Sequence, residues 1–83
     1  MKIVHKKSNN GRLDYDFDNG AWVSIDDEGL DWEYMSDADN EDSYCSGMLI
    51  WDNGAIVDFD GVFELPLAVK LALFEAGFIL NLE

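Results

Sequence analysis

Aspartate and glutamate are the residues of this chain most able to do chemistry, and they are concentrated in one region. The 83 residues include 18 Asp and Glu against 5 Lys and Arg, which gives a formal net charge of −13. Sixteen of these acids lie between Leu13 and Val69, a stretch without a single Lys or Arg. Carboxylates at this density can ligate cations, transfer protons or attract a strongly positive molecule, and they also repel one another.

Two acidic segments deserve comparison with calcium loops. The run from Asp14 to Gly20 begins like an EF-hand loop, but such a loop requires Gly at its sixth position and Glu at its twelfth, where this chain has Asn19 and Ile25. The second segment lacks a bidentate Glu at the required spacing, and its acids are Asp37, Asp39, Glu41 and Asp42. We therefore expect no metal site and no cofactor.

The residues that usually act as nucleophile and base are scarce. His5 is the only histidine and Cys45 the only cysteine, and the sequence offers no nucleophile paired with a base. Acids near Cys45 should raise the pKa of its thiol, which disfavours a reactive thiolate. We therefore do not expect an enzyme.

The acids must be positioned by hairpins, because three Asn-Gly pairs separate alternating segments at 10–11, 19–20 and 53–54. At the middle pair, a three-residue loop of residues 18–20 sets Leu13 opposite Ile25 and Tyr15 opposite Val23. A two-residue loop would mix acid and apolar side chains on one face. The pattern therefore favours the three-residue loop.

Three-residue loops are expected at the other two pairs as well. At 9–11 such a loop sets Lys6 opposite Asp14, and at 52–54 it sets Leu49 beside Val57. It also turns Ile50 and Ile56 toward the outer face. Residues 17–26 and 51–60 are identical at six of ten positions, which is consistent with a duplicated hairpin or with convergence on good turn chemistry.

The remaining segments complete the fold. Residues 30–34 alternate like a strand, and residues 36–43 have the composition of an exposed acidic loop. Pro66 and Gly77 bracket a helix from Leu67 to Ala76. This helix is so apolar that either the sheet covers it or part of it forms the contact of a homodimer.

The predicted fold class is α+β, with one domain over residues 1–83. It consists of a twisted antiparallel sheet of five to six strands in a hairpin-rich meander, with one C-terminal helix packed on one face. The registers above gather a set of side chains on the face away from the helix. These are Asp14, Asp16, Asp26, Asp31, Glu33, Asp58 and Asp60, with Trp22 among them as an apolar anchor.

We interpret this acidic face, together with the acids Asp37, Asp39, Glu41 and Asp42 of the loop, as a partner-binding surface. The alternative is a solvated face that only aids solubility, but an ordinary surface would intersperse Lys among the acids. Reversing the charges of Asp31, Glu33 and Asp14 should then weaken binding without unfolding the domain.

Compartment follows from what the sequence lacks. The chain has one Cys, no apolar run typical of a signal peptide, and no segment of the roughly 18 apolar residues that a membrane span needs. We expect a cytoplasmic protein that does not enter a membrane.

In size and charge pattern, residues 13–69 resemble the small acidic inhibitors that bacteriophages and mobile elements make against restriction enzymes, CRISPR surveillance complexes and uracil-DNA glycosylase. No family motif supports the resemblance. It implies an inhibitor that mimics nucleic-acid charge on a basic nucleic-acid-binding protein and does not itself bind nucleic acid. Two alternatives remain open: an immunity protein or antitoxin against a nuclease toxin, or an acidic domain that is adapted to salt and has no charged partner.

Overall fold

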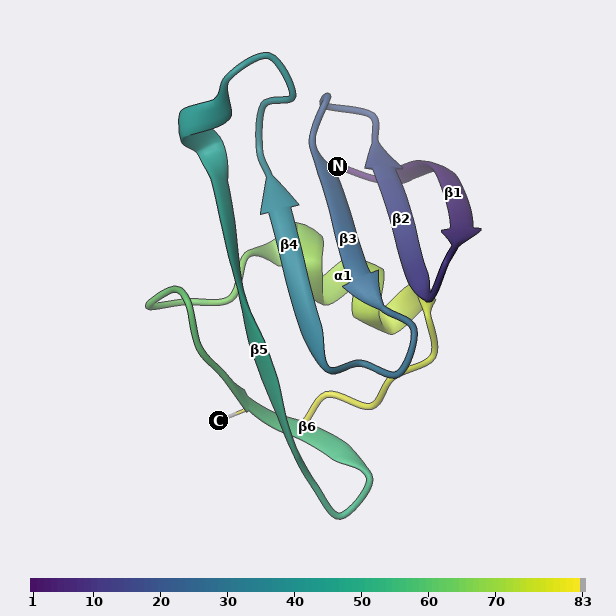
Figure 1. Cartoon of the computed structure of the whole chain (residues 1–83), viewed down its shortest axis with the longest axis vertical. Helices are drawn as coiled ribbons and strands as arrows, with labels where there is room; N and C mark the ends of the chain where they lie inside the picture. Colours follow the sequence, from purple (N-terminus) through teal and green to yellow (C-terminus); the bar gives the residue numbers. More distant parts are fainter. Residues whose placement is uncertain (83) are drawn as a thin grey trace.

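The computed structural model describes residues 1–82 and contains a six-stranded antiparallel sheet with one C-terminal helix on one of its faces (Figure 1). The strands follow one another in the sheet in chain order, and the sheet is not closed. The elements are β1 (Ile3–Asn9), β2 (Arg12–Phe17), β3 (Trp22–Asp26), β4 (Asp31–Met35), the short 3₁₀ helix η1 (Glu41–Ser43), β5 (Tyr44–Asp52), β6 (Ala55–Phe59) and α1 (Leu67–Glu75). The predicted α+β class is confirmed.

The middle hairpin has the predicted three-residue loop. The Phe17 N–H donates to the Ala21 carbonyl oxygen at 2.9 Å, and Gly20 is left-handed with φ of 87°. Leu13 lies opposite Ile25 and Tyr15 opposite Val23, as expected. The apolar residues of β2 and β3 therefore share the face that α1 covers.

The loops of the two other hairpins are one residue shorter than predicted. Both residues of each Asn-Gly pair are left-handed, with φ of 51° and 81° at Asn10 and Gly11, and this geometry makes a two-residue turn. Lys7, and not Lys6, consequently lies opposite Asp14. At 53–54 the short turn pairs Asp52 with Ala55.

A bulge in β6 adds a second shift to the predicted pairing with β5, because one step along β5 matches two steps along β6, from Ile56 to Asp58. The register shifts between Ile50 and Trp51, so Leu49 lies opposite Phe59 instead of Val57. The two-residue turn itself sets Ile56 opposite Trp51, and Ile56 is fully buried, which contradicts its predicted place on the outer face. Trp51 is held in place by its indole N–H, which donates to the Gly29 carbonyl oxygen at 2.7 Å.

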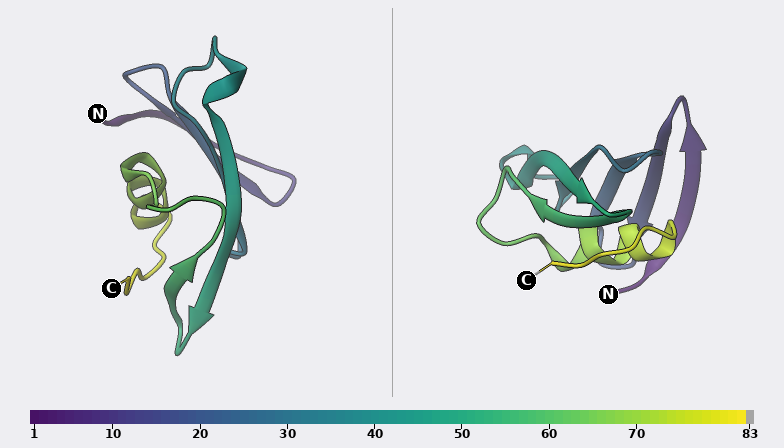
Figure 2. Two further views of the ribbon diagram at one scale, coloured as in Figure 1. Left: turned by 90° about the vertical axis from the view of Figure 1, so that its left-hand side faces the viewer. Right: turned by 90° about the horizontal axis from the view of Figure 1, so that it is seen from below.

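Helix α1 begins directly after Pro66 and is followed by left-handed Gly77, as predicted. Figure 2 shows it lying along one face of the twisted sheet. Its buried residues are Ala68, Val69, Ala72 and Leu73. They meet a core whose largest fully buried side chains include Trp32 and Ile25, each contributing about 1.5–3 kcal/mol by burial.

The edge strand β1 is exposed along most of its length and carries two adjacent lysines. Lys6 Nζ donates to Glu75 Oε2 at 2.6 Å, which links this edge to the end of α1. Lysine on an edge strand opposes pairing with a second sheet. Among residues 1–82, no helix has the length and apolar character needed to cross a membrane.

The chain crosses β5 very closely just after β6. A Cβ added at Gly47 would lie 2.0 Å from the Asp60 carbonyl oxygen, and one added at Gly61 would lie 2.0 Å from the Ser46 carbonyl oxygen. Two backbone segments therefore touch where only glycine leaves room. This contact positions the start of the connection to α1.

Gly47→Ala should destabilise the protein by about 2–3 kcal/mol, because its methyl group must displace backbone atoms. The matched control is Gly54→Ala, which meets no atom within 4 Å and suffers only from its φ of 77°, a cost of about 1 kcal/mol. Urea unfolding of both variants measures the difference. Equal stabilities would contradict the close crossing.

Candidate partner-binding face

The outer face is the side of the sheet away from α1, and it holds six of the acids singled out in the sequence, five of them grouped on β2, β3 and β4. Directly opposite residues on neighbouring strands share a face, so the pairings of Asp14 with Ser24 and of Ser24 with Glu33 place one row across three strands. The five acids are Asp14 and Asp16 on β2, Asp26 on β3, and Asp31 and Glu33 on β4.

Arg12 lies among these acids, contrary to the expectation of a face without cations. Its Nη1 donates to Asp31 Oδ1 at 2.5 Å, and its Nη2 donates to Glu33 Oε2 at 2.9 Å. Nε donates to Ser24 Oγ at 3.2 Å, and Ser24 is buried at this position. One guanidinium therefore joins two carboxylates of β4 to the start of β2.

The charge of Arg12 is firmly held. Partial burial of the guanidinium lowers its pKa, but the hydrogen bond that it donates to Asp31 and the charges of Asp31, Glu33 and Asp26 raise the pKa more, so the pKa of Arg12 stands above its ordinary value. The Arg12 side chain is 27% exposed. This partial exposure weakens the ion pairs relative to a buried network.

A basic margin borders the outer face along β1. Lys7 lies opposite Asp14, and His5 lies opposite Asp16 instead of facing Tyr15 as its predicted register required. The acids of β2 therefore have positive or titratable neighbours on one side. The sheet face is less negative along β1 than the sequence of residues 13–69 indicates.

Aromatic and apolar side chains occupy the opposite side of this face. The rings of Trp22 and Tyr44 lie 6.2 Å apart, and the Tyr44 hydroxyl donates to Glu33 Oε1 at 2.8 Å. Met48 and Ile50 are exposed on β5. Trp22 and Ile50 thus lie on the outer face, where the sequence placed them.

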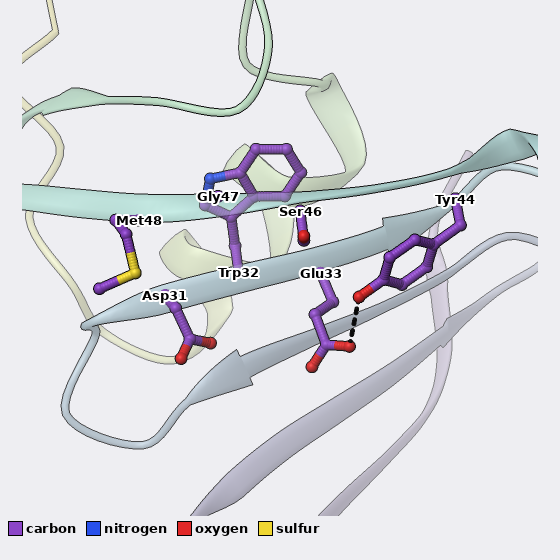
Figure 3. Close-up of a pocket in the computed structure, with 7 residues that line it drawn as sticks. All are labelled: Asp31, Trp32, Glu33, Tyr44, Ser46, Gly47 and Met48. Carbon is purple, nitrogen blue, oxygen red and sulfur yellow. Dashed lines mark hydrogen bonds between the residues drawn. The ribbon is translucent and has the colours of Figure 1, made fainter.

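An open depression of about 270 Å³ lies between β4 and β5. Figure 3 shows the side chains of Asp31, Glu33 and Met48 on one side of these strands, while the Trp32 indole points to the other side. Two acids and one exposed apolar side chain therefore line one hollow. A cationic side chain with an aliphatic stem would fit such a lining.

The remaining predicted residues are more dispersed. Asp58 lies opposite Ile50 and is therefore on the outer face as predicted, but on β6, apart from the five acids of β2 to β4. Asp60 Oδ1 accepts the Met48 N–H at 2.7 Å and so helps to hold the crossing over β5. Its carboxylate has a structural task and does not join the five acids of the outer face.

The loop of residues 36–43 presents all of its acids to solvent. The Asp37 carboxylate accepts the Asp39 N–H at 3.0 Å, and the Asn40 side chain accepts the Asp42 N–H at 3.1 Å. Figure 1 shows this loop at the same end of the sheet as the β2–β3 turn. The hydrogen bonds give the loop a defined shape, so its acids are held near that end.

One further acidic group was missed in the sequence. The carboxylate oxygens of Asp26, Asp27 and Glu28 lie within 4.8 Å of one another. Asp26 Oδ2 already accepts the N–H groups of Glu28 and Leu30, at 2.9 and 3.2 Å. The carboxylate therefore closes the β3–β4 turn, and we assign no metal to the group.

Burial raises the pKa of the Cys45 thiol. The predicted direction is confirmed, but its cause is removal from water instead of the charge of nearby acids. A thiol with a raised pKa carries little thiolate at neutral pH.

Two residues that shape the outer face were not among the predicted site residues. Arg12 could have been found, because it has the same strand parity as Asp14 and falls opposite Asp26 in the predicted register. Tyr44 could not, because its approach to Glu33 depends on how the loop of residues 36–43 returns to the sheet. Comparison of the chain with family models found no match, and searches of curated proteins and of solved structures found no significant match either.

Replacing Arg12 with Gln should lower the free energy of unfolding by about 1–2 kcal/mol at low salt. The two carboxylates of Asp31 and Glu33 then lie side by side on β4 without a cation between them. Lys7→Gln is the control, since it removes the same charge from an exposed position and should cost less than about 0.5 kcal/mol. Urea unfolding at low and high salt measures both. If the two variants were equally stable, Arg12 would have no special role.

Alkaline pH should destabilise the protein partly through Tyr44. The hydrogen bond to Glu33, then burial, raises the pKa of Tyr44, so above the ordinary value of about 10 the unfolded chain loses this proton first. The stability contributed by Tyr44 is therefore complete below that value and is lost as pH rises through the higher folded value.

Thermal unfolding between about pH 9 and about pH 11 tests this effect, with Tyr44→Phe as the variant. The melting temperature of the variant should fall less steeply than that of the wild type. Burial also raises the pKa of Tyr15 and Tyr34, so part of the slope should remain. Superimposable profiles would show that the Tyr44 to Glu33 bond contributes nothing.

Proposed function

We propose that this protein binds the nucleic-acid-binding surface of a basic protein and inhibits it by presenting carboxylates in place of phosphates. The observation that carries the proposal is the gathering of carboxylates from three neighbouring strands on one face, in a chain of net charge −13. Such an array costs stability through repulsion, and a cationic partner relieves that cost.

The end of the sheet that carries the β2–β3 turn and the loop of residues 36–43 is the most suitable contact. Arg12 and Lys7 offset charge elsewhere on the outer face, whereas at this end Lys2 lies beside Asp18 and the loop of residues 36–43 contains no Lys or Arg. We call it the acidic end, formed by Asp16, Asp18, Asp37, Asp39, Glu41 and Asp42. The Trp22 and Tyr44 rings lie beside it on β3 and β5 and supply apolar contact area.

This assignment changes the choice of variants. Asp31 and Glu33 each bind Arg12, so reversing their charges would place three cations together and destabilise the fold. We therefore expect charge reversal at Asp31 and Glu33 to destabilise the domain, contrary to the prediction from the sequence. The loop acids are exposed, and amide side chains can keep the hydrogen bonds they accept from backbone N–H groups.

Binding should be tested with a loop variant, Asp37→Asn, Asp39→Asn, Glu41→Gln and Asp42→Asn, which changes the net charge from −13 to −9. The partner is first captured from cell lysate on immobilised wild-type protein, eluted with salt, identified and purified. The affinity of the loop variant for it should fall at least about tenfold, and that of the wild type should fall steeply with salt. The purified partner should also lose nucleic-acid binding when the wild-type protein is added.

The matched control removes four exposed charges elsewhere: Asp27→Asn, Glu28→Gln, Asp52→Asn and Glu64→Gln, again giving −9. Its affinity should change by less than about threefold. Equal losses in both variants would mean that net charge alone matters and that the acidic end is not the interface. A partner that still binds DNA or RNA in the presence of this protein would refute the inhibitory mechanism.

A further inference from the structure

Helix α1 has a second apolar stripe that the sheet does not cover. Ala68, Val69, Ala72 and Leu73 face the core, whereas Leu67, Leu71 and Phe74 lie on the other side of the helix. Leu67 is 59% exposed and Phe74 is 78% exposed. Figure 2 shows that α1 has one side toward the sheet and one side away from it. Leu71, which lies between Leu67 and Phe74, is half-buried and packs partly against the core. Exposed large apolar side chains such as Leu67 and Phe74 are typical of an interaction surface.

The spacing of this stripe suits a second helix. Leu67, Leu71 and Phe74 are separated by four and then three residues, which is the repeat of a helix-to-helix seam. At 100° per residue, Lys70 and Glu75 fall on opposite flanks of the seam. They occupy the positions whose charges set the orientation of paired helices.

We propose that a second copy of this chain packs its own α1 against this stripe, with the two helices parallel about a two-fold axis. In a parallel pair, the left flank of one helix meets the right flank of the other. Lys70 then faces Glu75 of the partner subunit, five residues further along, and the same contact occurs twice. An antiparallel pair would instead set Lys70 against its own copy and Glu75 against its own copy.

The distribution of charge also favours this face for self-association. A chain of net charge −13 repels its own copies. Three of its five cations lie around α1, because Lys6 pairs with Glu75, Lys2 lines a hollow with Leu71 and Phe74, and Lys70 is on the helix itself. A two-fold contact through α1 turns the two acidic outer faces away from each other.

The proposed dimer is weak and reversible. The helix has 9 residues, which corresponds to a seam of about 13 Å. An interface of this length lies at the small end of specific contacts, and we expect a dissociation constant on the order of 10–100 μM. Salt should strengthen the dimer by screening the repulsion between copies, whereas it should weaken binding through the acidic end. Failure of one proposal is therefore distinguishable from failure of the other.

Sedimentation equilibrium of the full chain, from about 10 μM to about 1 mM and at low and high salt, tests the dimer. The wild type should dimerise with concentration, and more readily in high salt. Phe74→Glu should raise the dissociation constant at least about tenfold, since each copy would bring a charge into the seam. Ile50→Glu adds the same charge on the outer face and should change it less than about threefold.

Thermal unfolding of both variants confirms that each is folded. A wild type that stays monomeric throughout, or a Phe74→Glu variant that dimerises as well as the wild type, would overturn the proposal.

Charge exchange tests the orientation. Lys70→Glu changes the net charge to −15 and Glu75→Lys changes it to −11, yet both should weaken the dimer, because each places like charges face to face. The double exchange is made together with Lys6→Gln, because Glu75→Lys would otherwise place a second cation against Lys6. Its dissociation constant should return to within about threefold of that of Lys6→Gln alone. A dimer strengthened by Glu75→Lys alone, or not restored by the double exchange, would overturn the parallel arrangement.

Discussion

Repulsion among carboxylates is the constraint that organises this molecule. The chain has eighteen acids and five lysines and arginines, so the position of each cation determines which acids are neutralised. Arg12 binds both Asp31 and Glu33, which lie two residues apart on β4 and would otherwise repel each other without a cation nearby. The basic N-terminal hairpin is therefore part of the acidic face and completes it.

The two faces of the sheet are held by different forces. The inner face is stabilised by the burial of Trp32, Ile25 and the inner residues of α1. The hydrophobic effect that drives this burial is not directional and does not depend on charge. The other face depends on ion pairs and hydrogen bonds that respond to salt and pH. Trp51 joins the lower part of β5 to the rest, because its indole binds Gly29 and packs against Phe78 at 5.7 Å between ring centroids.

Much of the fold could be predicted because local chemistry and periodicity agree. Pro66 and Gly77 delimit the helix, and alternation along β2 and β3 selects one register out of two. The predicted loops of the first and third hairpins were one residue too long, because an Asn-Gly pair supports both two-residue and three-residue loops. Segments 17–26 and 51–60 show this directly, since six identical positions out of ten still give a three-residue loop in one and a two-residue loop in the other.

The sequence by itself determined the charge asymmetry, the α+β class, the ends of the helix and the face on which the acids of β2 to β4 lie, because these follow from composition and from the two-residue period of a strand. Only the tertiary structure decided which side chains meet across β4 and β5 and which surface of α1 stays exposed. Tyr44 reaches Glu33 through the return of the loop of residues 36–43, and buried Ile56 forms a bridge with Leu80 near the C-terminus. Contacts of this kind join segments far apart in the chain, so no local pattern contains them.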